Sequence, residues 1–157
     1  AAGLILALRE FSPMTKIIAV EPDGAACLGK SLSNGYLTRL EQICTFSDGV
    51  AVQEMGKIPF EICNDGLYDY VKVSKDEICS AVEMIHKDTR AIAEASGAIG
   101  LAGAKKYLTN NKIKQKRVGI ILTGSNLSFQ KLEYVAQRCN LGSNTEKFIS
   151  ITISEKI

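Results

Sequence analysis

The hydrophobic pattern along the chain changes repeatedly between the spacing of a strand and the spacing of a helix. Short β-branched or alternating apolar runs predict strands at residues 16–21, 68–73, 118–122 and 147–153. Helical spacing and helix-end signals predict helices at residues 4–11, 23–32, 60–64, 96–108 and 129–139. A further helix follows Ser74, because Ser74 and Glu77 have the spacing of a capping box. Since strands and helices alternate, we expect an α/β fold in which helices flank a parallel sheet.

The stretch 118–126 is the clearest candidate for a binding site. Its apolar part, residues 118–122, has the composition of a buried strand in a parallel sheet. Thr123 and Gly124 follow at the carboxyl end, which is the edge where ligands bind in open α/β sheets. Gly124 would also let the backbone approach a flat ligand closely. The alternative is an ordinary strand-to-helix turn in which Ser125 or Asn126 caps the next helix.

Composition narrows the class of protein. The 157 residues suffice for one domain with a sizeable core, and the net charge of +2 implies neither nucleic acid nor an acidic membrane as a partner. The five cysteines form no CxxC pair and are odd in number, so we expect free thiols rather than a disulfide framework or a zinc site. His86 is the single histidine, which excludes a histidine-rich metal site.

The beginning of the chain is apolar over residues 1–8 and has no initiator methionine. No basic stretch precedes this run, as a secretory signal requires, and the run is too short to span a bilayer. We therefore expect a fragment that starts inside a buried helix. We expect it to be cytoplasmic, or in a plastid or mitochondrion if the source is eukaryotic.

Five segments together carry a family resemblance. They read IAVEP at 18–22, FSDGVAV at 46–52, AEASGA at 93–98, LAGAKKY at 101–107 and LTGSN at 122–126. In this order and spacing the chain resembles the carboxyl-terminal half of the catalytic domain of threonine dehydratases (threonine ammonia-lyases), and the biosynthetic form most. These enzymes depend on pyridoxal 5'-phosphate. The resemblance implies a tryptophan-synthase-β-like large domain of fold type II, with residues 1–145 in the catalytic domain and residues 146–157 beginning an ACT-like regulatory domain.

The resemblance also implies four cofactor-binding residues. Thr123 matches the position whose hydroxyl meets the pyridine nitrogen, and Gly124 follows it. Gly49 matches a turn that passes close to the cofactor ring, although a plain surface turn would look the same. Glu94 matches a glutamate near the cofactor or substrate, with Ala95 in place of the family's proline, although it could also be an ordinary helix-start glutamate. No catalytic residue is assigned in this chain, because the Schiff-base lysine and the phosphate-binding loop are expected upstream of Ala1.

A threonine hydroxyl at the ring nitrogen has a chemical consequence. It is neutral, so it cannot keep that nitrogen protonated as a carboxylate would, and the ring becomes a weaker electron sink. This suits β-elimination. The implied reaction converts L-threonine, or L-serine, to a keto acid and ammonium, which for threonine gives 2-oxobutanoate, the first step of isoleucine synthesis. Isoleucine is then the expected allosteric inhibitor and a homotetramer the expected assembly, whereas the fragment alone should be inactive.

A metal is not expected. Glu21 resembles a glutamate that helps bind a divalent cation in related serine racemases, but the second carboxylate of that site falls at Cys27 here. A thiol suits magnesium or calcium poorly.

Two alternatives remain at this point. Within the same chemistry, the chain could belong to a catabolic serine/threonine dehydratase or a serine racemase. From another class, it could be a non-catalytic α/β module that binds a small molecule.

Overall fold

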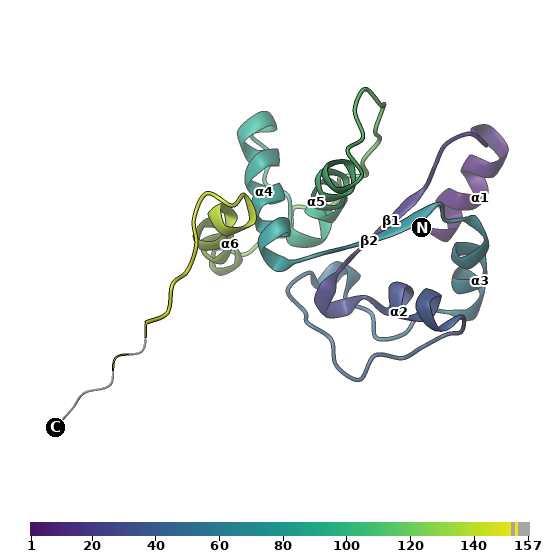
Figure 1. Cartoon of the computed structure of the whole chain (residues 1–157), viewed down its shortest axis with the longest axis horizontal. Helices are drawn as coiled ribbons and strands as arrows, with labels where there is room; N and C mark the ends of the chain where they lie inside the picture. Colours follow the sequence, from purple (N-terminus) through teal and green to yellow (C-terminus); the bar gives the residue numbers. More distant parts are fainter. Residues whose placement is uncertain (152, 154–157) are drawn as a thin grey trace.

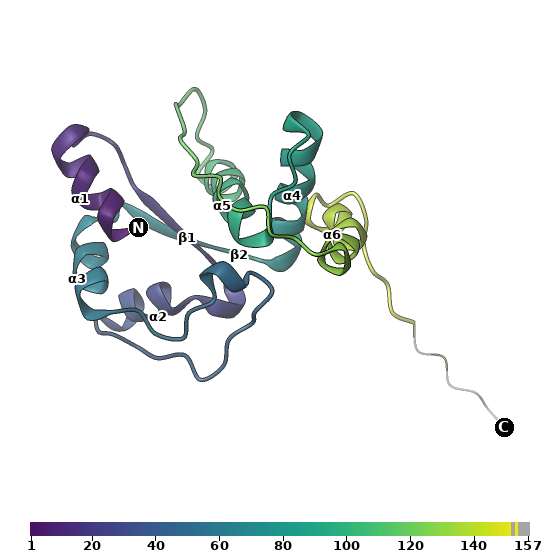
Figure 2. The same cartoon turned by 180° about the vertical axis from the view of Figure 1, so that it is seen from behind.

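The computed structural model describes residues 1–151 and 153. Two parallel strands, β1 (Ile18–Pro22) and β2 (Asp69–Val73), pair with Ile18 opposite Asp69 and Pro22 opposite Val73. Helices gather at both ends of this strand pair, with α1 and α3 near one end and α4, α5 and α6 near the other (Figures 1 and 2). The predicted α/β fold, a parallel sheet flanked by helices, is confirmed.

The first group of helices packs around the amino-terminal half of the chain. It consists of α1 (Ala2–Phe11), α2 (Cys27–Asn34) and α3 (Lys57–Gly66), and a short 3-10 turn, η1 (Asp23–Ala25), precedes α2. One core cluster joins them to the sheet; its buried members are Ile5, Ala19, Leu28, Phe60 and Cys63.

The second group contains α4 (Lys75–Thr89), α5 (Ala95–Asn110) and α6 (Phe129–Gly142). Its core includes the apolar face predicted for α4, because Ile78, Val82 and Ile85 are all buried. The capping box at the start of α4 is also present: the Glu77 amide donates to the Ser74 hydroxyl, and the Ser74 amide donates to the Glu77 carboxylate. Each cap of this kind contributes about 1 kcal/mol to helix stability.

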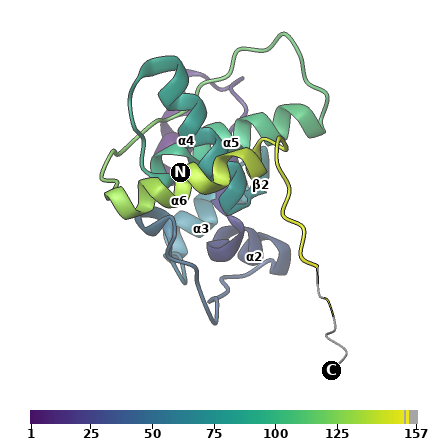
Figure 3. The ribbon, with the colours of Figure 1, turned by 90° about the vertical axis from the view of Figure 1, so that its left-hand side faces the viewer.

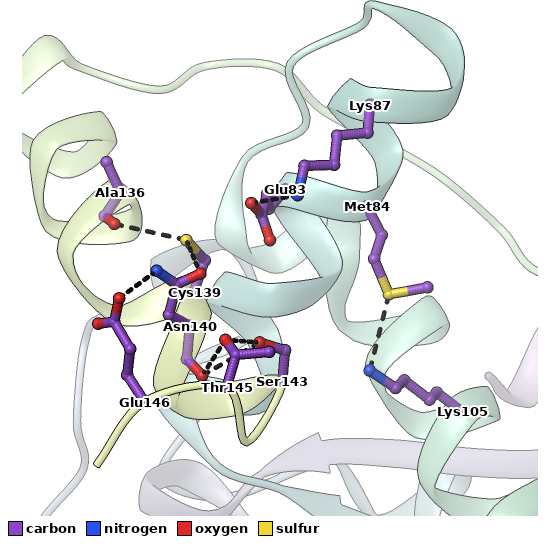
Figure 4. A network of polar contacts seen from close by, with 10 residues as sticks. All are labelled: Glu83, Met84, Lys87, Lys105, Ala136, Cys139, Asn140, Ser143, Thr145 and Glu146. Atoms are coloured by element: carbon purple, nitrogen blue, oxygen red, sulfur yellow. Dashed lines mark hydrogen bonds and ion pairs between the residues drawn. The ribbon is translucent and has the colours of Figure 1, made fainter.

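Helix α6 packs against α4 (Figure 3). Near its carboxyl end the Arg138 guanidinium donates twice to the Asp76 carboxylate, with a distance of 3.1 Å from Nη2 to Oδ2. Beyond the helix, Ser143 and Thr145 both donate to the carbonyl of Asn140, whose side chain donates to Glu146 (Figure 4). The Arg138–Asp76 pair holds α6 against α4, whereas the contacts with Asn140 order the turn that follows α6.

The prediction of a strand at residues 118–122 is wrong for the residues that the structure describes. These residues have no regular secondary structure, and Val118, Ile120, Ile121 and Leu122 are 48%, 39%, 64% and 48% exposed. A strand forms only when a neighbouring strand pairs its amides and carbonyls. Here the segment passes along α5 rather than beside β1 or β2, so the described chain gives it no ladder partner.

Two further expectations need correction. Residues 147–151 and 153 form no strand although their apolar positions alternate, and residue 152 and residues 154–157 lie outside the described structure. The first helix exists but is not buried all round, since Ile5 is enclosed while Leu4 and Leu6 are exposed. In both places the apolar side chains lack a packing partner within the described residues.

In the part of the chain that the structure describes, no helix is long and apolar enough to cross a membrane. His86 is exposed. The five cysteines are free thiols, as the sequence predicts. The division at residue 145 stays a prediction.

Candidate functional site

The turn at residues 123–126 lies on the amino-terminal end of α5. Small residues make this approach possible, because a Cβ on Gly97 would collide with the carbonyl oxygen of Thr123 and a Cβ on Gly100 would lie 2.7 Å from the Ile120 side chain. The sequence predicts close backbone packing for the glycines of this helix. Gly97 confirms it, whereas Gly100 faces the side chain of Ile120 and Gly103 the side chain of Val20 on β1.

Glu94 holds this turn in place from the start of α5. Its amide donates to the carbonyl of Gly124 at 3.2 Å, and its carboxylate Oε2 accepts the amide of Asn126 at 3.1 Å. Gly124 has a φ of +77°, and a Cβ there would collide with the Glu94 carboxylate. Glycine is therefore required at this position both by the left-handed backbone and by the contact with Glu94.

Gly49 reaches the same place from a distant part of the chain. It lies in η2 (Asp48–Val50), and its amide donates to the Ser96 hydroxyl at 3.0 Å and to the Asp48 carboxylate at 3.1 Å. A Cβ on Gly49 would lie 3.5 Å from Oε1 of Glu94. The structure thus gathers the four predicted residues, Gly49, Glu94, Thr123 and Gly124, around the beginning of α5.

An ion pair borders this cluster. Nζ of Lys131 on α6 lies 2.8 Å from Oδ2 of Asp48. The hydrogen bond from Lys131, and then its charge, lower the pKa of the Asp48 carboxyl below its ordinary value. Asp48 is therefore a carboxylate at neutral pH.

Ser96 and Lys131 are the residues that the sequence reasoning missed. Ser96 belongs to the AEASGA segment that supports the resemblance, so that segment could have pointed to it. Lys131 has no such signal, because its partner lies 83 residues earlier in the chain.

The Thr123 hydroxyl of the turn remains available. Among the described residues, no side chain or backbone group pairs with the Thr123 hydroxyl, and Thr123 is exposed. A hydroxyl can donate one hydrogen bond and accept others.

Two surface hollows lie away from this turn. One, of about 370 Å³, is lined in part by Met14, Lys16 and Tyr68, and the other, of about 400 Å³, in part by Lys30, Tyr70 and Lys72.

Glu21 has a structural partner set of its own. Its carboxylate accepts the amides of Leu28 at 3.0 Å and Gly29 at 2.9 Å at the start of α2, and the Cys27 sulfur lies 3.8 Å from its Oε1. Burial, and then the charge of Glu21, raise the pKa of the Cys27 thiol, which keeps it protonated at neutral pH. A protonated thiol is a poor metal ligand, so the expectation of no metal stays a prediction that these contacts support.

Comparison with known proteins identifies relatives of this chain. The chain is 44% identical over 156 residues to a biosynthetic L-threonine dehydratase of Haemophilus influenzae and 40% identical to that of Escherichia coli. In each case the match covers 99% of this chain and 30% of the relative, so the chain spans under a third of the length of these relatives.

Solved structures of related enzymes also match the chain. The processed form of threonine deaminase isoform 2 from Solanum lycopersicum matches with a TM-score of 0.84 and 38% identity, over 87% of this chain and 40% of that one. Maize serine racemase matches with a TM-score of 0.74 and 28% identity, over 87% of this chain and 42% of that one. Residues 1–124 match the family described as pyridoxal-phosphate dependent enzyme. Since this match includes 124 of the 157 residues, the chain belongs to the family of pyridoxal-phosphate dependent enzymes.

Proposed function

We propose that the chain is part of a threonine dehydratase that uses pyridoxal phosphate to convert L-threonine to 2-oxobutanoate and ammonium. The observation that carries this proposal is the 44% identity to a biosynthetic L-threonine dehydratase, which extends over 99% of the chain. The gathering of Gly49, Glu94, Thr123 and Gly124 at one end of α5 supports it.

The residues present suit the cofactor. The turn at 123–126 exposes a hydroxyl without a partner among the described residues, and the glycines at 49 and 124 let both backbone segments lie close against Glu94 beside it. We propose that the Thr123 hydroxyl meets the pyridine nitrogen and that the ring approaches the backbone at Gly49 and Gly124. Glu94 supports the turn.

When bound, pyridoxal phosphate supplies the electron sink that makes loss of the α-proton and the β-hydroxyl accessible. Thr123 tunes this property, because a neutral hydroxyl donates a hydrogen bond without keeping the nitrogen protonated. Glu94 acts on Thr123 indirectly. By accepting the Asn126 amide and donating to the Gly124 carbonyl, it fixes the backbone on both sides of that turn.

The Schiff-base lysine and the phosphate-binding loop are proposed to belong to the part of the relatives that this chain does not span. The chain's own contribution is therefore the side of the site that faces the ring nitrogen. Residues 1–145 are proposed as catalytic-domain sequence and residues 146–157 as the start of an ACT-like regulatory domain.

The test is the activity of the full-length protein. With L-threonine and pyridoxal phosphate it should release 2-oxobutanoate and ammonium in equal amounts, and removal of the cofactor should abolish the reaction. Absence of keto acid from both threonine and serine, in a folded protein that has taken up the cofactor, would overturn the proposal.

A second function within the same chemistry has one observation in its favour. Structures of serine racemases from maize and from Dictyostelium discoideum match with TM-scores of 0.74 and 0.70, at 28% identity each. Chiral analysis of the products separates the two functions. A racemase forms D-serine from L-serine, whereas a threonine dehydratase releases keto acid from L-threonine.

Regulation, assembly and location extend the proposal. We propose that isoleucine inhibits the full-length enzyme, since the matched bacterial relatives are called biosynthetic, and that the enzyme is a homotetramer. For a bacterial source the cytoplasm is proposed; the matched relative from Schizosaccharomyces pombe is called mitochondrial and one from Solanum lycopersicum chloroplastic. An inhibition assay with isoleucine and a sedimentation measurement test these points.

A further inference from the structure

The contacts of the candidate site form a closed ring. Starting from the turn at 123–126, the chain enters α6, whose first residues are capped by Ser128 through the Lys131 amide. Lys131 then pairs with Asp48, whose neighbour Gly49 donates to Ser96 at the start of α5. Glu94, two residues earlier, accepts the amide of Asn126 in the turn and so completes the ring.

Lys131 is the link that closes this ring from α6. The helix is a firm base, because Arg138 binds Asp76 on α4 and a Cβ on Gly142 would collide with the Asp76 carbonyl. The lysine side chain is one-third exposed, at 34%, whereas Asp48 is 66% exposed. The pair joins a well-packed helix to the loop before η2, where the Phe46 ring also lies 5.2 Å from the Tyr134 ring of α6.

The loop before η2 has no regular secondary structure, so contacts with other elements determine its position. Residues 37–47 that precede η2 have no helix or strand, and Asp48 is held to other elements only through Lys131 among the described contacts. Gly49 is held by Ser96, and the same amide also donates to Asp48. A displacement of the Asp48 carboxylate would therefore change the orientation of the Gly49 peptide.

We propose that Lys131 is a positioning residue that fixes the Gly49 turn of the cofactor site through the carboxylate of Asp48. This inference rests on the proposed function for its link to the cofactor, although the effect on the turn itself does not depend on it. A surface ion pair contributes little to stability, so the expected consequence concerns local order rather than folding.

The test compares variants of the full-length protein by amide hydrogen exchange without cofactor. In Lys131→Met, exchange of the peptide at 46–52 should be faster by about two- to fivefold, as expected for loss of a partly exposed ion pair. Asp48→Asn should give the same increase, because asparagine still accepts the Gly49 amide but no longer attracts Lys131. The double variant should show no further increase, and Lys131→Arg should restore slow exchange.

The matched control is Lys87→Met. Lys87 also forms a surface ion pair, at 2.7 Å from Glu83, but both partners lie on α4 (Figure 4). Its removal should leave exchange at 46–52 unchanged. Equal exchange in Lys131→Met, Lys87→Met and the wild type would overturn the positioning role, as would additive effects of the two single variants.

A second readout connects the ion pair to the cofactor. Release of pyridoxal phosphate, followed by its absorbance, should be faster in Lys131→Met by a similar factor, with melting temperature unchanged. Faster exchange together with wild-type cofactor release would overturn the link to the cofactor. A wild-type protein that takes up no pyridoxal phosphate would instead contradict the proposed function, and the exchange data would still decide the role of Lys131 in the turn.

Discussion

At the scale of single residues, the site depends on hydrogen bonds that hold backbone in place. Glu94 illustrates this, because both of its contacts with the turn at 123–126 involve main-chain groups of Gly124 and Asn126. Its carboxylate needs to accept a hydrogen bond, and its charge is secondary to that task. We therefore propose that Glu94 acts through Thr123 rather than on the substrate.

This view predicts a difference between two variants of the full-length enzyme. Glu94→Gln keeps an oxygen that can accept the Asn126 amide, so it should bind pyridoxal phosphate almost as the wild type does. Glu94→Ala loses the acceptor and should raise the dissociation constant of the cofactor about tenfold, which corresponds to about 1.4 kcal/mol. Equilibrium titration by cofactor fluorescence measures both. An equal rise of the dissociation constant in both variants would show that the charge of Glu94 matters instead.

At the scale of elements, helix α5 is the platform on which the site is assembled. Its glycines admit the segment 120–124 at a distance that no larger residue permits. The sequence predicts this helix, the capping box and the strands β1 and β2, because their signals are local in the chain. It could not predict that Lys131 pairs with Asp48, since a charge on a helix surface does not identify a partner 83 residues away.

The packing of α5 predicts the effect of Gly97→Ala. Alanine favours a helix by about 1 kcal/mol over glycine, but its Cβ would collide with the Thr123 carbonyl and displace the turn. We expect a lower melting temperature and weaker cofactor binding by about tenfold, a loss of about 1.4 kcal/mol. Thr109→Ala, at an exposed position of the same helix, is the control and should change neither. A Gly97→Ala protein with wild-type cofactor affinity would contradict the assigned packing.

At the scale of the whole molecule, the exposed apolar segment 118–122 marks where the described fold is incomplete. The sequence predicts a strand there because its composition suits one, but pairing requires a neighbour that the described residues do not provide. Since the chain spans 30% of the matched dehydratases, we expect that neighbour in the remaining part of the full-length protein.

Hydrogen exchange tests this expectation. Amides at 118–122 should exchange rapidly in the isolated 157-residue chain and at least about tenfold more slowly in the full-length protein, where ladder hydrogen bonds would protect them. Amides of β1 and β2, which are paired already, should change much less. Equally rapid exchange at 118–122 in both proteins would show that the segment is not a strand in the complete enzyme.

The central claim is that the Thr123 hydroxyl serves the nitrogen of a bound pyridoxal phosphate in a threonine dehydratase. The most direct measurement is kcat for 2-oxobutanoate formation by full-length Thr123→Ser and Thr123→Val. Serine keeps the hydroxyl and should retain most of the activity, whereas the isosteric valine should lose at least about fivefold, as expected for one hydrogen bond of about 1–3 kcal/mol. Equal activity of the valine and serine variants would contradict the claim.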